Sequence, residues 1–304
     1  MLDAMIRHRA LRLLSVILLS MLASVLAAQS RAHADLQPIT LTPAIVAAGS
    51  PELIRVVAPE DARLEGEWLG RKIEFFHARN GSAWLALAGV DVEAKTGPST
   101  LSITVKPAGG GAARDLSRTI EIHPAHYHTE SLTVSPKFVE PGPDAMKEIE
   151  EESKLKAKIY AASVDYPEWS GSFRAPVKAQ PTDSFGTRRM FNGKLSTRHM
   201  GMDFRAASGT VVRASNSGVV VLARHLYYEG NCVILDHGQG FFTLSMHFSR
   251  IDVKEGQHVS AGDRLGLSGA TGRVTGPHLH WAVRWHGANL DPAKLLTLDL
   301  SQAH

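Results

Sequence analysis

The sequence predicts an all-β chain that consists of a small N-terminal β-sandwich, a helical linker and a C-terminal glycine-rich β-sheet domain. Two stretches, 36–139 and 185–296, consist of short apolar runs separated by turn residues, a pattern typical of antiparallel strands. Only the segment 144–162 has helix-forming composition. The 304 residues suffice for about two domains, and the apolar fraction of 44% excludes a disordered chain.

The first 34 residues have the three parts of a secretory signal peptide. Arg7, Arg9 and Arg12 form a basic start, an apolar run follows over 13–28, and Ala32-His33-Ala34 forms a small-residue exit. The run of about 16 residues is shorter than the ~20 that span a bilayer. We expect export, to the periplasm in a Gram-negative host. An uncleaved anchor, as the only membrane contact, is the alternative.

The net charge of +3 and the pI of about 9 are explained by this first segment. Removing its four arginines and one aspartate from 33 basic and 30 acidic side chains leaves 29 of each sign. We therefore expect no nucleic-acid partner. The single cysteine, Cys232, lies in an apolar run and excludes both an internal disulfide and a multi-cysteine zinc site.

The region 35–140 is expected to form the sandwich. Turn signals separate apolar runs at 53–57, 83–87, 101–105 and 119–122, and the region contains no grouping of catalytic residue types. Its position before the linker suggests that it positions or occludes a site in the C-terminal domain.

The linker is expected over 141–168. Charged residues spaced four apart, Glu150 with Lys154 and Glu152 with Lys156, predict ion pairs on a solvated helix face. Asp144, just after a proline-glycine-proline break, is positioned to cap the start of the helix.

The residue types suited to a metal site occur in the C-terminal domain, 169–304. They form His199-x-x-x-Asp203, an isolated His247, and His278-x-His280. On a strand, residues two apart share a face, so the paired histidines can reach one site. Two neutral imidazoles and one carboxylate suit a catalytic Zn²⁺ and leave a fourth position for water. The chain has no His-Glu-x-x-His helix, which excludes a thermolysin-type arrangement.

With these three motifs together, residues 183–292 resemble the lysostaphin and LytM-type zinc metallopeptidases, which hydrolyse peptide cross-links of bacterial peptidoglycan. The most specific string is Gly266-Leu-Ser-Gly-Ala-Thr-Gly-Arg-Val-Thr-Gly-Pro-His-Leu-His280. The resemblance implies a zinc endopeptidase that acts on peptidoglycan stem peptides. It assigns His199, Asp203 and His280 as zinc ligands, and it assigns water activation and transition-state stabilisation to His247 and His278.

Two further residues, Arg189 and Asn192, lie near the site in the family pattern, where they bind substrate or form a structural turn. Two other functions are alternatives to a zinc endopeptidase. A non-enzymatic activator of cell-wall amidases would be expected to have a degenerate ligand set, whereas all five positions are filled here. A lipoyl-type carrier would need a modifiable lysine at a hairpin tip, and neither Lys194 nor Lys254 has that setting. The oligomeric state cannot be inferred from the sequence.

Overall fold

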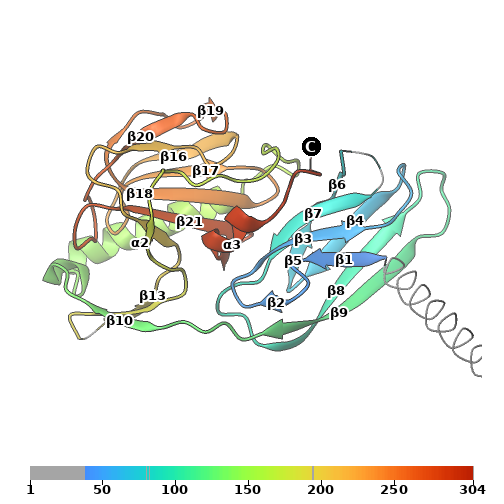
Figure 1. Ribbon diagram of the computed structural model, residues 1–304, viewed down its shortest axis with the longest axis horizontal. Coiled ribbons are helices and arrows are strands. Elements are labelled where there is room, and N and C mark those ends of the chain that lie inside the picture. Colours follow the sequence, from blue (N-terminus) through green and yellow to red (C-terminus); the bar gives the residue numbers. More distant parts are fainter. Residues whose placement is uncertain (1–37, 80, 82, 194, 304) are drawn as a thin grey trace, which may run out of the picture.

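The computed structural model describes residues 38–79, 81, 83–193 and 195–303, so the signal-peptide prediction for 1–34 lies outside the described residues. Figure 1 shows two β-rich regions with one long helix beside the C-terminal region. The predicted all-β class is confirmed, because helices are confined to two α-helices and one short 3₁₀ turn in the described part of the chain. Nowhere in these ranges is a helix both long enough and apolar enough to cross a membrane.

The N-terminal region contains a four-stranded and a five-stranded sheet. The first consists, in spatial order, of β1 (Ile39–Thr42), β3 (Pro51–Val56), β7 (Trp84–Gly89) and β6 (Phe76–His77). The second consists of β2 (Val46–Ala47), β9 (Arg114–His123), β8 (Gly97–Lys106), β4 (Arg63–Trp68) and β5 (Arg71–Ile73). Residues that alternate along these strands, such as Leu101 and Ile103 of β8, are buried in one cluster with Ile54 of the first sheet. This period of two is why the segments form half-buried strands.

The C-terminal region is one ten-stranded antiparallel sheet with a small three-stranded sheet beside it. The path of the large sheet is β11 (Pro181–Asp183), β14 (Met202–Phe204), β21 (Leu279–Trp285), β18 (Phe241–Ile251), β17 (Gly230–Asp236), β16 (Gly218–Leu226) and β19 (His258–Val259). Beside this path lie β15 (Val211–Arg213), β20 (Arg264–Ser268) and β22 (Ala288–Leu290), and the last helix is α3 (Pro292–Thr297). The small sheet contains β10 (Thr129–Leu132), β12 (Arg188–Phe191) and β13 (Leu195–Arg198).

The small sheet crosses the predicted boundary at residue 140. Its strand β10 precedes that boundary, yet it pairs in parallel with β12 of the C-terminal region, from Thr129 opposite Arg188 to Leu132 opposite Phe191. The predicted domain limits stay predictions, but this pairing ties the end of the N-terminal segment to the glycine-rich region.

The two regions meet where β22 and α3 pack against the sandwich. A Cβ atom at Gly89 would lie 2.5 Å from Leu290, so the close packing requires glycine there. Asp91 accepts a hydrogen bond from the backbone of Asn289 at 2.7 Å, and the Asp291 amide donates to the carbonyl of Gly49. The sandwich therefore packs on β22 and on the start of α3.

The linker contains helix α2 (Pro143–Tyr160), and two sequence predictions about it need correction. The N-cap is Gly142, not Asp144, because Pro143 takes the first helical position and moves Asp144 into the first turn. The predicted Glu150–Lys154 pair is present at 2.6 Å. Glu152 and Lys156, in contrast, do not pair with each other.

Both of these side chains contact the C-terminal region instead. Glu152 accepts from the Tyr227 amide, and Lys156 pairs with Glu229. Leu155 and Ile159 pack on the apolar cluster that includes Cys232, which is buried as expected. The helix is therefore solvated on one face only, since its apolar face covers the sheet.

Glu52 on β3 is a buried carboxyl group that makes the stability of the sandwich depend on pH. Its Oε1 accepts a hydrogen bond from Ser50 at 2.6 Å, whereas Oε2 has no partner among the described residues. Burial raises the pKa of Glu52 from 4.5 to about 8, against the smaller effects of Ser50 and of Lys294 in α3. Because the folded pKa is the higher one, the stabilising contribution is fully present below the unfolded pKa. It is lost as the pH rises through the folded pKa.

We expect Glu52→Gln to flatten the pH dependence of the free energy of unfolding. Wild type should lose up to about 5 kcal/mol between about pH 4.5 and pH 8, since each unit between the two pKa values corresponds to about 1.4 kcal/mol. Urea denaturation across this interval measures the effect. The exposed Glu67 of β4 provides the matched control, Glu67→Gln. Parallel curves for wild type and Glu52→Gln would contradict this account.

Candidate metal centre and its groove

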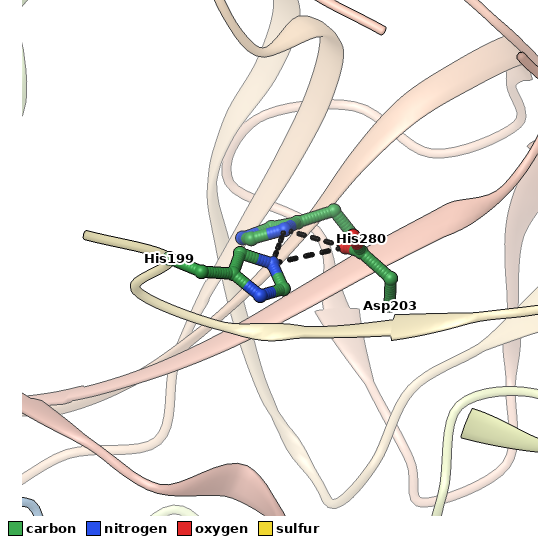
Figure 2. A group of neighbouring side chains, drawn as sticks. All are labelled: His199, Asp203 and His280. Atoms are coloured by element: carbon green, nitrogen blue, oxygen red, sulfur yellow. Dashed lines mark hydrogen bonds and ion pairs between the residues drawn. The ribbon is translucent and has the colours of Figure 1, made fainter. Parts of the chain in front are cut away.

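Three side chains from separate segments converge on one point, as Figure 2 shows. The Nε2 atom of His199 lies 3.1 Å from Oδ1 of Asp203 and 2.9 Å from Nδ1 of His280. The third edge, from His280 Nδ1 to Asp203 Oδ1, measures 2.9 Å. All three residues are buried. The sequence motifs His199-x-x-x-Asp203 and His278-x-His280 therefore meet in space.

The register of the strands brings these side chains together. Asp203 of β14 lies directly opposite His280 of β21, so their side chains share one face of the sheet. His199 follows β13 and reaches the same face across the bend at residues 199–201. That bend needs Gly201, because a Cβ atom there would lie 2.4 Å from Nε2 of His280 and 2.7 Å from the carbonyl of Trp281.

We expect Gly201→Ala to displace the His280 imidazole and to weaken metal binding by about 10-fold or more, the range seen when groups that orient ligands are lost. Metal content after dialysis against limiting zinc measures this. The control is Gly109→Ala, because a Cβ atom at Gly109 meets nothing within 4 Å. Undiminished metal content in Gly201→Ala would show that the imidazole adjusts.

The ring nitrogen of His199 that faces away from the cluster sets its tautomer. Nδ1 lies 2.9 Å from the carbonyl oxygen of Ser184 and 3.1 Å from Oδ2 of Asp183, and both of these oxygens accept. Nδ1 must therefore carry the proton, and in the neutral ring Nε2 directs its lone pair at Asp203 and His280. A carboxylate behind a histidine in this way orients and strengthens it as a metal ligand.

Arg189 holds the two carboxylates of the site. Its Nη2 donates to Oδ2 of Asp203 at 2.5 Å and also to Oδ2 of Asp183. Burial raises the pKa of Asp203, but hydrogen bonds with His199 and His280 outweigh burial and hold the pKa well below its usual range. The carboxylate is therefore ionised at neutral pH, as a metal ligand must be.

The two ring pKa values shift in opposite directions. Burial, with hydrogen bonds to Asp203 acting against it, lowers the pKa of His280 to about 4, which leaves the ring neutral at neutral pH. Burial also lowers the pKa of His199, but its hydrogen bonds to Asp183 and Asp203 outweigh this and raise the pKa. The surroundings of His199 thus favour positive charge.

The three converging atoms fit a small divalent cation. In a tetrahedral site with bonds of 2.0–2.1 Å, ligand atoms lie about 3.3 Å apart, and the three edges here are 2.9–3.1 Å. The set of one carboxylate and two imidazoles matches a zinc ligand set. With the His199 proton on Nδ1, Nε2 of His199 and Oδ1 of Asp203 are both acceptors, so their close approach requires either a proton on Nδ1 of His280 or a cation between the three atoms.

His247 and His278 lie on the open side of this cluster. Their ring centroids are 4.9 Å apart, and Nε2 of His278 is 3.7 Å from Oδ1 of Asp203. Nδ1 of His247 donates to the carbonyl of Thr271 at 2.8 Å, and Nδ1 of His278 donates to that of Gly276 at 2.8 Å. In their neutral forms, both rings therefore direct an unprotonated Nε2 away from these backbone anchors.

The backbone at His247 is unusual. Its φ is 67°, in the left-handed region that non-glycine residues rarely adopt. At this point strand β18 changes partners, because Met246 pairs with His280 of β21 whereas Phe248 pairs with Ser268 of β20. Burial, followed by the charges of His280 and His278, lowers the pKa of the His247 side chain to about 3. The ring is therefore a neutral hydrogen-bond acceptor near neutral pH.

These five side chains lie in a groove of about 490 Å³. Its walls include Glu130 and Leu132 of β10, Arg189 of β12, and the loop 273–278. A second cavity of about 360 Å³ shares Met246 and His280 with the groove and continues under α2. Strand β10 and helix α2 contribute to the walls of these two cavities, whereas none of the described residues of 38–123 does.

Of the two residues predicted to contact substrate, one lies in the groove. Arg189 lines it, although its guanidinium is bound to Asp183 and Asp203. Asn192 forms a turn with φ of 52°, and its amide group binds the backbone of Val134 through both Oδ1 and Nδ2 at 2.9 Å. These contacts match the structural alternative for Asn192. The sequence motifs did not indicate Asp183.

Residues 197–292 match the family model described as Peptidase family M23. The catalytic domain of lysostaphin from Staphylococcus simulans is 33% identical over 93% of that domain and 40% of this chain, with a TM-score of 0.36. The chain contains a peptidase M23 domain. The family predicted from the sequence is thereby confirmed.

Two further comparisons place this M23 protein more closely. It is 37% identical over 158 residues to the peptidoglycan DD-endopeptidase ShyA of Vibrio cholerae, a match that covers 49% of this chain. The match spans little more than a third of that relative, 37% of its length. A crystal structure of an M23 peptidase from Pseudomonas aeruginosa, 27% identical, covers 82% of this chain and 94% of its own, with a TM-score of 0.64. The second likeness extends beyond the M23 domain.

Proposed function

We propose that this M23 protein is an exported, zinc-dependent endopeptidase that cleaves peptide cross-links of bacterial peptidoglycan. The observation that carries the proposal is the convergence of His199, Asp203 and His280 within 2.9–3.1 Å at one groove, with two more histidines beside them. Relatives at 35–38% identity named peptidoglycan DD-endopeptidases support the substrate.

In this proposal His199, Asp203 and His280 hold the metal through Nε2, Oδ1 and Nδ1, respectively. A zinc ion bound there would supply Lewis acidity toward the scissile carbonyl and would ease the ionisation of a water molecule. Arg189 and Asp183 keep the ligands in place from behind. Since their hydrogen bonds are made before substrate arrives, the site needs little reorganisation during the reaction.

The two remaining histidines handle protons and developing charge. With Nδ1 bound to the Thr271 carbonyl, His247 presents an unprotonated Nε2 that can accept a proton during hydrolysis. His278 is anchored in the same way to Gly276. Once protonated on Nε2, either ring can donate a hydrogen bond to the oxyanion or return the proton to the leaving amine.

Digestion of purified sacculi tests the proposal directly. The mature protein should release cross-linked fragments as monomers, with a new amine and a new carboxylate at the cleaved bond, and a chelator followed by zinc should abolish and then restore this release. The alternative, a non-enzymatic amidase activator, predicts no cleavage unless an amidase is added. The complete five-residue site favours the enzyme.

A further inference from the structure

Arg273 in the wall of the groove is a cation that forms no ion pair with a described acidic residue. Its guanidinium carbon lies 4.7 Å from the ring centroid of Phe191 and 4.5 Å from that of Tyr228. Its backbone amide donates to the Tyr228 carbonyl at 2.9 Å, which fixes the start of the side chain. Among the described residues, no hydrogen bond or ion pair engages its five N–H donors.

The other arginines of the groove are already bound to acids. Arg189 pairs with Asp183 and Asp203, and Arg198 lies 3.6 Å from Glu93. The nearby carboxylate of Glu229 is paired with Lys156 of α2. Glu229 acts on Arg273 through its charge alone, so the N–H donors of Arg273 stay available to a ligand of the groove.

The two aromatic rings make this cation selective. Their π faces stabilise the guanidinium and restrict its rotation, so its planar donors keep one orientation. Burial lowers the pKa of Arg273, but an arginine remains charged at neutral pH. A fixed guanidinium in partly dry surroundings matches a carboxylate, which accepts two parallel hydrogen bonds.

We propose that Arg273 anchors a free carboxylate of the peptide substrate next to the scissile bond and so selects acidic stem peptides over amidated ones. This deepens the proposed function and rests on it. The anchor is two residues from Thr271, whose carbonyl orients His247. Gly272, which joins them, has a φ of 76° and packs closely on Gly230, because a Cβ atom there would lie 2.3 Å from the Gly230 amide nitrogen. Substrate held by Arg273 is thereby aligned with the catalytic histidine.

The test compares one cross-linked peptide dimer in two forms, with its stem carboxylates free or converted to amides. Wild type should cleave the free form with a kcat/KM about 10- to 100-fold higher, the range for a charge-assisted hydrogen-bond pair. Arg273→Gln should lose this preference by slowing on the free form only. Arg273→Lys, which keeps the charge and loses the planar fork, should keep part of it. The exposed Arg213 of β15 provides the control, Arg213→Gln.

The two hypotheses fail in different ways. If wild type cleaves neither dimer, the proposed function is wrong. The carboxylate anchor is wrong if wild type cleaves both dimers without preferring the free form. It is also wrong if Arg273→Gln retains the full preference for the free form. Zinc content and thermal unfolding of each variant are measured in parallel. If the Gln variant does not fold, the Lys variant decides, since an unchanged preference there overturns a bidentate anchor.

Discussion

The His280→Ala protein is expected to lose both bound metal and peptidoglycan cleavage. Loss of a group that orients a metal ligand typically lowers metal affinity 10- to 100-fold. This substitution removes one of the three ligand atoms itself, so metal affinity should fall further. Cleavage should fall about 1,000-fold or more, since metal polarisation contributes several kcal/mol to transition-state stabilisation. Metal analysis and muropeptide chromatography measure the two effects. The exposed His258 provides the matched control, His258→Ala.

The structure allows a sharper version of this test, because the two histidines use different ring nitrogens. His280 directs Nδ1 at the cluster, whereas His199 directs Nε2. The amide group of Asn places its polar atoms near the position of Nδ1, and that of Gln places them near Nε2. His280→Asn should therefore retain more metal than His280→Gln, and the order should reverse at His199. Muropeptide cleavage by metal-free His280→Ala would refute the ligand assignment.

Much of the site could be predicted because its residues occur in short motifs with strand spacing. His278-x-His280 fits a period of two, and Gly201 between His199 and Asp203 signals a close approach, which the structure shows to be that of the His280 ring. The register that sets Asp203 opposite His280 could not be derived from either motif alone. It depends on pairing between segments that lie far apart in the chain.

The groups behind the site were harder to predict, since no local pattern marks them. Asp183 contacts His199 through Oδ2, but in the sequence it is one acidic residue in a polar turn. Thr271 and Gly276 orient histidines through backbone carbonyls, which every residue possesses. The contacts of the linker helix also have no local pattern, so the sequence predicted only a solvated helix. Pairing of Lys156 with Glu229 depends on how the helix docks on the sheet.

The His247→Ala protein, in contrast to His280→Ala, is expected to keep its metal and to lose cleavage. His247 contributes none of the three converging atoms, so zinc content should match wild type. The kcat should fall about 100- to 10,000-fold, the range for removing a general acid–base group. The residue is buried and its φ is 67°, so stability must be followed alongside activity.

Two substitutions at this position separate proton transfer from oxyanion stabilisation. Gln places an N–H donor close to the position of Nε2 but cannot take up a proton, so His247→Gln should recover activity only if the residue acts as a donor. Because the Thr271 carbonyl accepts from Nδ1, the neutral ring has an acceptor at Nε2, and we expect no recovery. His247→Gly relieves the left-handed backbone and removes the imidazole, so added free imidazole should restore part of the rate. Recovery with Gln and none with imidazole would assign His247 to the oxyanion and leave proton transfer to His278.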